Sequence, residues 1–244
     1  MKYSSHTPGT DVRTLVERQC RGWDRLSALL KQTEKRAREA PDGYRPVITV
    51  SGSTGSGRGR LALALCEALE YELVGRELLD EVASDLNCQR ALLETLDEKV
   101  QSNISLMLAS VLRGREIENQ DYVASLFRVI GSLAEKGGLV ILGRGGAVIL
   151  GNKTGLRIRV EAPLPVRIRR IMEVRNLNER EARLYVETHD SEQREFWRHC
   201  FHREENDPLL FDLTLNSERI DPEEAVSIVQ AALARRAPQT TQGR

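Results

Sequence analysis

The sequence predicts an α/β fold built on a parallel β-sheet. A β-branched run, Val47-Ile48-Thr49-Val50, leads through a glycine-rich segment into an apolar helical pattern that ends at Leu69. A second apolar run, residues 139–142, is bounded by glycines, as is typical of a central strand buried on both faces. Strand-like and helix-like segments then alternate toward the C-terminus. In such folds, ligands bind beyond the carboxyl ends of the strands.

The elements follow one another in a regular order. After the strand at 47–50 and the helix to residue 69, the sequence predicts a short strand at 71–74 and a helix at 76–86. Residues 89–136 are mainly helical, with an interruption near 113–114 or 118–119. Strands at 139–142, 156–162 and 211–216 complete a five-stranded sheet. A helix is expected at 167–176, and Asn178 with Glu181 forms a capping box that opens another. A charged stretch at 189–207 follows, and the last helix starts at Asp221-Pro222 and runs to about residue 236.

Residues 1–44 are predicted to form a helical extension to this domain. Within residues 11–40, apolar side chains that include Leu15, Trp23, Leu26 and Leu30 recur at steps of three and four. This apolar stripe needs a cover, which is either the chain's own domain or a second subunit in a homo-oligomer. The sequence leaves both open. We assign residues 45–236 to the main domain and residues 237–244 to a disordered tail.

Charge and composition exclude several classes of function. The 36 basic and 36 acidic residues give a formal net charge of zero, so no overall field attracts nucleic acid or a membrane. The four cysteines contain no Cys-x-x-Cys pair, which favours reduced thiols over a disulfide framework or a zinc site. We therefore expect a cytoplasmic protein that binds a small molecule and neither nucleic acid nor membrane.

The glycine-rich segment after the first strand has the form of a phosphate-binding loop. Such a loop presents backbone N–H groups and the positive end of a helix to an anion. In the pattern Gly-x-x-x-x-Gly-Lys-Ser/Thr, Gly52 and Gly57 fill the glycine places, but Arg58 replaces the lysine and Gly59 replaces the hydroxyl residue. The alternative is a turn that packs a helix onto the sheet. The candidate phosphate-binding residues are Gly52, Ser53, Thr54, Gly55, Ser56, Gly57, Arg58 and Gly59.

Outside this loop, arginines are the candidate phosphate-binding residues, because a planar guanidinium binds phosphate through two hydrogen bonds. Arg144 lies between glycines at the end of a predicted strand, which favours a functional role. In contrast, Arg175, Arg180 and Arg183 are expected to be solvated helix positions.

Several blocks together resemble the cytidylate kinase-like family of P-loop nucleoside monophosphate kinases. The resemblance covers residues 47–231. It rests on Ile48-Thr49-Val50-Ser51 with Gly55-Ser56-Gly57, Gly75-Arg76-Glu77-Leu78-Leu79, residues 140–150 around Gly143-Arg144-Gly145, residues 162–172, Thr188-His189-Asp190 with Arg194 and Phe196, and residues 207–216.

This resemblance implies a P-loop kinase-like three-layer fold with a helical lid. It also implies ATP-dependent phosphorylation of a nucleoside monophosphate, CMP or dCMP by analogy, with ATP and Mg²⁺ as cofactors. Residues 52–58 would bind the donor phosphates, and Arg76 and Arg144 the acceptor phosphate. Asp190 and Arg194 would belong to the closing lid and, with Arg58 and Arg144, form the catalytic set.

Three departures from the family pattern concern magnesium and the acceptor. Gly75 replaces the acidic residue expected before Arg76, Gly59 offers no hydroxyl, and Gly143 offers no carboxylate. The magnesium ligands therefore stay unassigned, with Ser56, Asp80 and Asp190 as the nearest candidates. The alternative function is a catalytically degenerate nucleotide or anion sensor of the same fold.

Overall fold

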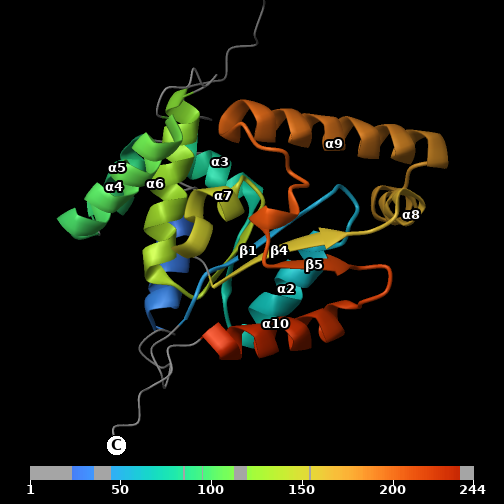
Figure 1. Ribbon diagram of the computed structural model, residues 1–244, viewed down its shortest axis with the longest axis horizontal. Helices are drawn as coiled ribbons and strands as arrows, with labels where there is room; N and C mark the ends of the chain where they lie inside the picture. The colour runs from blue at the N-terminus through green and yellow to red at the C-terminus, as the bar shows by residue number, and fades with distance from the viewer. Residues whose placement is uncertain are drawn as a thin grey trace, which may run out of the picture.

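A five-stranded, all-parallel sheet forms the centre of the molecule (Figure 1). The computed structural model describes residues 24–35, 45–84, 86–94, 96–112, 120–153 and 155–236. The strand order is β2-β3-β1-β4-β5. The strands are β1 (Ile48–Gly52), β2 (Glu72–Val74), β3 (Leu139–Leu142), β4 (Leu156–Glu161) and β5 (Leu213–Asn216). The predicted five-stranded parallel sheet flanked by helices is confirmed.

Helices cover both faces of this sheet. They are α2 (Arg58–Leu69), α3 (Arg76–Ser84), α4 (Leu86–Glu94), α5 (Glu98–Leu112), α6 (Gln120–Lys136), α7 (Gly146–Leu150), α8 (Leu164–Arg175), α9 (Glu179–Phe201) and α10 (Pro222–Arg236). Single 3-10 turns lie at Gly151–Lys153 and Pro208–Leu210.

The two faces of the sheet are packed by different helices, as the alternation of side chains along a strand requires. Ile48 and Val50 of β1 lie in a cluster with residues of α2 and α10. Leu139 and Ile141 of β3 point the other way, into a larger cluster with α3, α6, α7 and the end of α9. Because both faces are covered, β3 consists wholly of apolar residues, whereas β1 and β4 also contain polar ones. The carboxyl ends of β1 and β3 stay open for a ligand.

The described part of the N-terminal segment is helical and packs on this same domain. Residues 24–35 form a helix whose Leu26, Leu29 and Leu30 are buried in the cluster that contains Leu79 and Val129. The domain itself therefore covers this part of the apolar stripe. Leu15 and Trp23, the remaining ends of the predicted helix, and the tail at 237–244 lie outside the described residues.

The start of α8 differs from expectation for a local reason, and two other features go beyond the sequence analysis. Helix α8 begins at Leu164 rather than residue 167, because Pro165 occupies the first turn, where its missing N–H costs no hydrogen bond. The capping box at Asn178 is present with both hydrogen bonds. The helix it opens continues through the charged stretch at 189–207 as far as Phe201, an end that the sequence did not place. Short α7 was not predicted.

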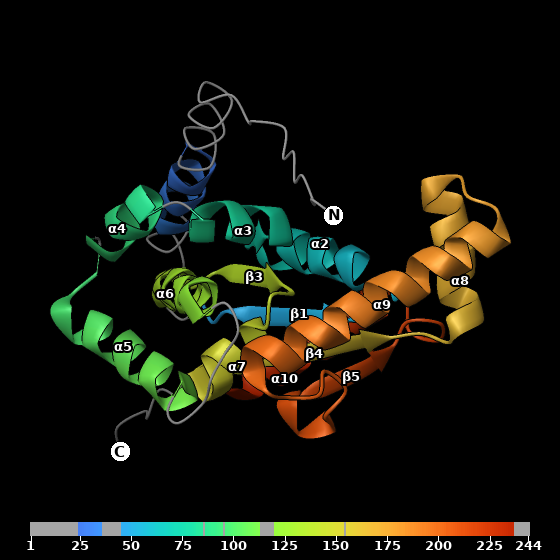
Figure 2. The same ribbon diagram turned by 90° about the horizontal axis from the view of Figure 1, so that it is seen from above.

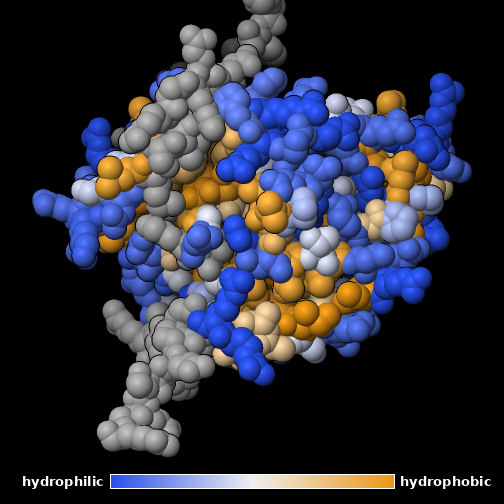
Figure 3. Space-filling view, in the orientation of Figure 1, coloured by the Kyte–Doolittle hydropathy of each residue, from blue (hydrophilic) through white to orange (hydrophobic). Residues whose placement is uncertain are grey.

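Helix α8 and the first half of α9 extend beyond the sheet at one end of the molecule (Figure 2). They share a small cluster of their own, formed by Ile168, Ala182 and Val186, apart from the two main ones. In the view of Figure 3, the surface over α9 is hydrophilic, and hydrophobic residues gather where β5 and α10 lie. None of the helices within the described ranges is long and apolar enough to cross a membrane.

Candidate active site

Two glycine turns lie side by side at the carboxyl ends of neighbouring strands. The first follows β1 and leads into α2, and the second follows β3 and leads into α7. Gly55 in the first turn has φ +77°, and an added Cβ would lie 2.7 Å from the backbone oxygen of Arg167. A larger residue would therefore strain the backbone and push α8 away from the turn. The second turn has three consecutive residues with positive φ, namely Gly143, Arg144 and Gly145.

The first turn presents a positive helix end that the described residues do not cap with a side chain. Helix α2 is preceded by Gly57, which supplies no capping oxygen. The hydroxyl of Ser56 is fully buried and has no hydrogen-bond partner among the described residues. Unpaired N–H groups and an unpaired buried hydroxyl are groups that a bound phosphate would satisfy. The turn therefore fits the phosphates of a nucleotide.

Arg58 lies at the start of α2 and folds back under the turn. One of its guanidinium nitrogens donates to the carbonyl oxygen of Gly52 and to Oε1 of Gln193, the latter at 2.9 Å. Burial lowers the pKa of Arg58, and the carboxylates of Glu205 and Asp190 raise it in part. An arginine stays charged through such a shift. The site thus holds a fixed cation in the place where the phosphate-loop pattern has lysine.

Arg144 in the second turn forms a double hydrogen bond with Asp80 of α3. Its Nε donates to Oδ1 at 2.6 Å, and Nη2 donates to Oδ2. The hydroxyl of Tyr122 donates to the same Oδ1 at 2.7 Å, and Arg76 lies 3.6 Å from Oδ2. Burial and the hydrogen bond with Asp80 raise the pKa of Tyr122 well above its usual range. The ring of Phe196 lies beneath the Arg144 guanidinium at 5.0 Å. Asp80 therefore brings Arg76 and Arg144 together.

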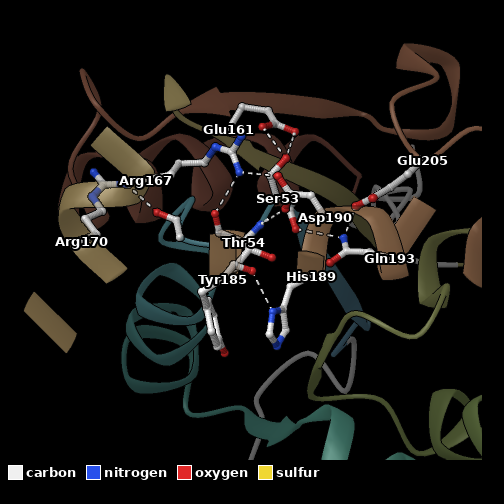
Figure 4. Close-up of polar contacts among 12 residues, drawn as sticks. Ser53, Thr54, Glu161, Arg167, Arg170, Tyr185, His189, Asp190, Gln193 and Glu205 are labelled. Carbon is white, nitrogen blue, oxygen red and sulfur yellow. Dashed lines mark hydrogen bonds and ion pairs between the residues drawn. The ribbon is translucent and has the colours of Figure 1, made fainter. Parts of the chain in front are cut away.

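Asp190 of α9 fastens that helix to the first turn (Figure 4). Its Oδ1 accepts the backbone N–H of Thr54 at 2.9 Å, and its Oδ2 accepts from Arg167 at 2.6 Å. The same Arg167 nitrogen donates to the carbonyl oxygen of Thr54 at 3.0 Å. Both carboxylate oxygens of Asp190 are thus engaged by the protein. The sequence did not single out Arg167, because nothing in its local pattern indicates contact with a turn more than a hundred residues earlier.

A cavity of about 350 Å³ lies between the two turns and α9. It brings together Arg58, Arg76 and Arg144, which the sequence placed in three separate motifs. The other lining residues are Ser51, Thr54, Glu77, Leu142, Gly143, Arg175, Tyr185, His189, Glu192, Gln193, Phe196 and Trp197. Helix α9 supplies much of this wall, including Tyr185 and His189, whose rings stack with centroids 3.9 Å apart.

Two exposed arginines of α8 and α9 differ in whether they border this cavity. Arg175 is exposed, but it also lines the cavity, donates to the hydroxyl of Tyr185 at 2.9 Å and lies over that ring. Arg175 is thus solvated, as expected, and in addition it borders the cavity. In contrast, Arg194, which the resemblance assigned to the lid, is exposed on α9 and is not among the lining residues.

The candidate magnesium ligands do not form a metal site in this conformation. Asp80 is engaged by Arg144 and Tyr122, and Asp190 is engaged by Thr54 and Arg167. The third candidate, Ser56, has an unpaired hydroxyl, but it is fully buried. Gly59 has no side-chain oxygen, and no group of three or more metal-ligating side chains occurs within the part of the chain that the structure describes. In this conformation the three candidates therefore do not form a ligand set for a protein-held magnesium ion.

Behind the first turn lies a buried polar network that sequence reasoning missed. Arg159 of β4 and Glu205, between α9 and β5, are only 7% and 6% exposed and contact each other. Burial raises the pKa of Glu205, although Arg159 and Gln193 lower it in part. Glu205 belongs to the charged stretch at 189–207, and Arg159 alternates with apolar residues in a predicted strand. No local pattern distinguishes such residues from surface charges.

A parallel sheet whose first strand runs through a glycine turn into an uncapped helix defines a phosphate-loop α/β protein. Comparison with known proteins identifies the family within this class. The sequence profile of the cytidylate kinase-like family matches residues 47–219, and the chain belongs to this family.

Two curated relatives are cytidylate kinases. The protein of Natronomonas pharaonis is 26% identical over 199 residues, which cover 81% of this chain and 94% of the relative. The protein of Methanopyrus kandleri is 27% identical over 192 residues, which cover 77% and 92%. Among solved structures, an uncharacterized protein from Eubacterium ventriosum has the same fold, with a TM-score of 0.61 and 24% identity over 79% of this chain and 99% of that one.

Proposed function

We propose that the chain catalyses ATP-dependent phosphoryl transfer to a nucleoside monophosphate, with CMP or dCMP as acceptor by analogy with its relatives. The observation that supports this most is the cavity between the two glycine turns, which Arg58, Arg76 and Arg144 border together. Three guanidinium groups around one space suit a reaction in which two highly charged phosphates must approach each other.

In this proposal the first turn binds the donor. The N–H groups of Gly55 and Gly57 and the hydroxyl of Ser56 would hold the β- and γ-phosphates, since the N–H groups of Thr54 and Ser56 donate to Asp190 and Ser53. Arg58 would neutralise the charge of these phosphates. Asp190 would keep the turn in shape by holding the N–H of Thr54. Such groups act by orientation and charge, which is most of what phosphoryl transfer asks of a protein.

The acceptor phosphate would lie beside Arg76 and Arg144. An oxygen of that phosphate attacks the γ-phosphorus of ATP, the bond to the β-phosphate oxygen breaks, and ADP and a nucleoside diphosphate result. Charge spreads over the transferred group in this transition state, and the three guanidinium groups stabilise it. Arg194, exposed on α9 here, would contribute only after a change in the position of the lid.

One observation favours the alternative of a nucleotide or anion sensor. The carboxylates of Asp80 and Asp190 are paired with Arg144 and Arg167, so neither is open to a metal ion in this conformation. Kinases of the phosphate-loop class rely on magnesium to neutralise the β- and γ-phosphates. A sensor would need only the backbone N–H groups and arginines that bind the phosphates, and no magnesium ion.

Turnover of ATP with magnesium against a panel of nucleoside monophosphates separates the two functions. Formation of a nucleoside diphosphate from one acceptor supports the kinase. Saturable ATP binding by calorimetry without transfer supports the sensor. If the chain neither binds ATP nor transfers phosphate, both are wrong.

Arg58→Ala tests the donor site separately. We expect ATP to bind at least tenfold more weakly, which corresponds to about 1.4 kcal/mol. Arg90→Ala is the matched control, since it removes an exposed guanidinium from α4 and should leave ATP affinity unchanged. Equal affinity in the natural protein and Arg58→Ala would remove Arg58 from the donor site.

A further inference from the structure

Arg58 is held in place by the side chain of Gln193, which comes from α9. Oε1 of Gln193 accepts from the Arg58 guanidinium at 2.9 Å. Its Nε2 donates to the carbonyl oxygen of Gly52 at 3.1 Å and to Oε1 of Glu205. The same Gly52 carbonyl accepts from Arg58. Gln193 and Arg58 thus converge on one backbone oxygen at the end of β1.

The chemistry of these partners fixes the orientation of the Gln193 amide. The guanidinium can only donate, so the oxygen of Gln193 must face it. The Gly52 carbonyl and the Glu205 carboxylate can only accept, so the amide nitrogen must face them. A flipped amide would place N–H against N–H on one side and oxygen against oxygen on the other. Gln193 therefore connects a buried cation to a buried anion in one orientation.

Glu205 is itself held from behind. Arg159 donates to its backbone oxygen at 2.7 Å and to its Oε1 at 3.3 Å. Arg159 also pairs with Glu161, which accepts a hydrogen bond from the Ser53 hydroxyl at 2.9 Å. The chain of contacts therefore leaves the turn at Arg58 and returns to it at Ser53. A network connected in this way resists rearrangement of any one member.

We propose that Gln193 and Glu205 are positioning residues that aim the Arg58 guanidinium, so that phosphate binding at the first turn depends on the docking of α9. The proposal rests on the proposed function, in which Arg58 meets the donor phosphates. The motifs that carry the family resemblance contain neither residue. Gln193 and Glu205 are needed because the cation at this place is an arginine. A lysine ammonium turns its three donors freely, whereas a planar guanidinium must be oriented as a whole.

A double-mutant cycle on ATP affinity tests this. Calorimetry on the full chain compares the natural protein, Gln193→Ala, Arg58→Lys and the double variant. We expect Gln193→Ala to weaken ATP binding about tenfold when Arg58 is present, and less than twofold in the Arg58→Lys background. Glu205→Ala should behave like Gln193→Ala, and Glu205→Gln, which keeps an acceptor oxygen, should retain most of the affinity.

Glu204→Ala is the matched control. Glu204 directly precedes Glu205, its side chain is 55% exposed, and it pairs with Arg198 at the surface. Its loss should therefore change neither ATP affinity nor the melting temperature. Thermal melting of every variant separates a role in the fold from a role in aiming Arg58.

The possible outcomes are distinct. Additive effects of Gln193→Ala and Arg58→Lys overturn the proposal, as does a lowered melting temperature with unchanged ATP affinity. Normal ATP binding by Gln193→Ala overturns the positioning role and leaves the proposed function intact. If the natural protein binds no ATP, the proposed function fails and the positioning role fails with it.

Discussion

Replacing Arg144 by alanine should reduce both the activity and the stability of this protein, and a second substitution should separate the two effects. The guanidinium donates two hydrogen bonds to Asp80. In Arg144→Ala, Asp80 keeps the hydroxyl of Tyr122 and the more distant Arg76 but loses its main counter-charge. In the double variant Arg144→Ala/Asp80→Asn, the carboxylate of residue 80 is also removed, so no partly buried charge is left without its partner.

The size of the stability effect follows from burial. The Arg144 and Asp80 side chains are 14% and 34% exposed, so the pair lies between a surface ion pair and a buried one. Removing one partner should cost about 2 kcal/mol, between the ~0–1 of exposed pairs and the ~3–5 of buried pairs. For a domain of this size that lowers the melting temperature by roughly 4–8 °C. Asp80→Asn added to Arg144→Ala should restore most of this loss.

Activity should not recover with stability. If Arg144 contacts the acceptor phosphate in the transition state, its loss lowers kcat/KM by about 100- to 1000-fold, or roughly 3–4 kcal/mol. Thermal melting by circular dichroism and a coupled assay with ATP and CMP measure the two quantities on the same samples. If the double variant regains activity together with stability, Arg144 acts through the fold, and our assignment to the acceptor is refuted.

Three further predictions concern the fold. Leu26→Ala removes a fully buried side chain and should cost about 2–5 kcal/mol in urea unfolding, whereas Leu63→Ala, 59% exposed, should change stability by less than about 0.5 kcal/mol. Burial tends to raise the pKa of Asp212, but hydrogen bonds from two arginines outweigh it and lower the pKa below its usual range. The ionised Asp212 carboxylate therefore stabilises the fold above about pH 4, and this stabilisation is lost as the pH falls further. Urea unfolding should show that Asp212→Asn is less stable than the natural protein by roughly 2 kcal/mol at pH 7. This difference in the free energy of unfolding should shrink in acid. Gly145→Ala would place a Cβ 2.2 Å from the ring of Phe201 at a positive φ, and its melting temperature should fall by several degrees or more.

The sheet could be predicted because its signals are local. Apolar runs bounded by glycines placed β1 and β3, and the capping box at Asn178 placed the start of α9. Short α7 follows directly on the second glycine turn and, with five residues, offers no period to detect. The sequence did not place the end of α9, because a charged stretch has the same composition whether it forms a helix or a loop.

The candidate site could be predicted only where a motif marks it. Arg58 and Arg144 follow glycine turns at strand ends, so their approach follows from the parallel topology. The contacts of Arg167 with Thr54 and of Gln193 with Arg58 join residues more than a hundred positions apart. Such pairings depend on how α8 and α9 pack, and a single sequence contains no local signal of them.

Helix α9 belongs to two hydrophobic clusters, and this limits how the site can move. Its first half packs with α8 through Ala182 and Val186, and its last turn packs in the main core through Trp197 and Phe201. At 1.5 Å per residue, its 23 residues span roughly 35 Å. Because a helix of that length moves as a rigid body, a small rotation of α9 about its buried end displaces α8 by a larger distance. If α9 moves when a ligand binds, it must either bend or turn Phe201 against Gly145, so the position of its far end and the geometry of the second turn are coupled.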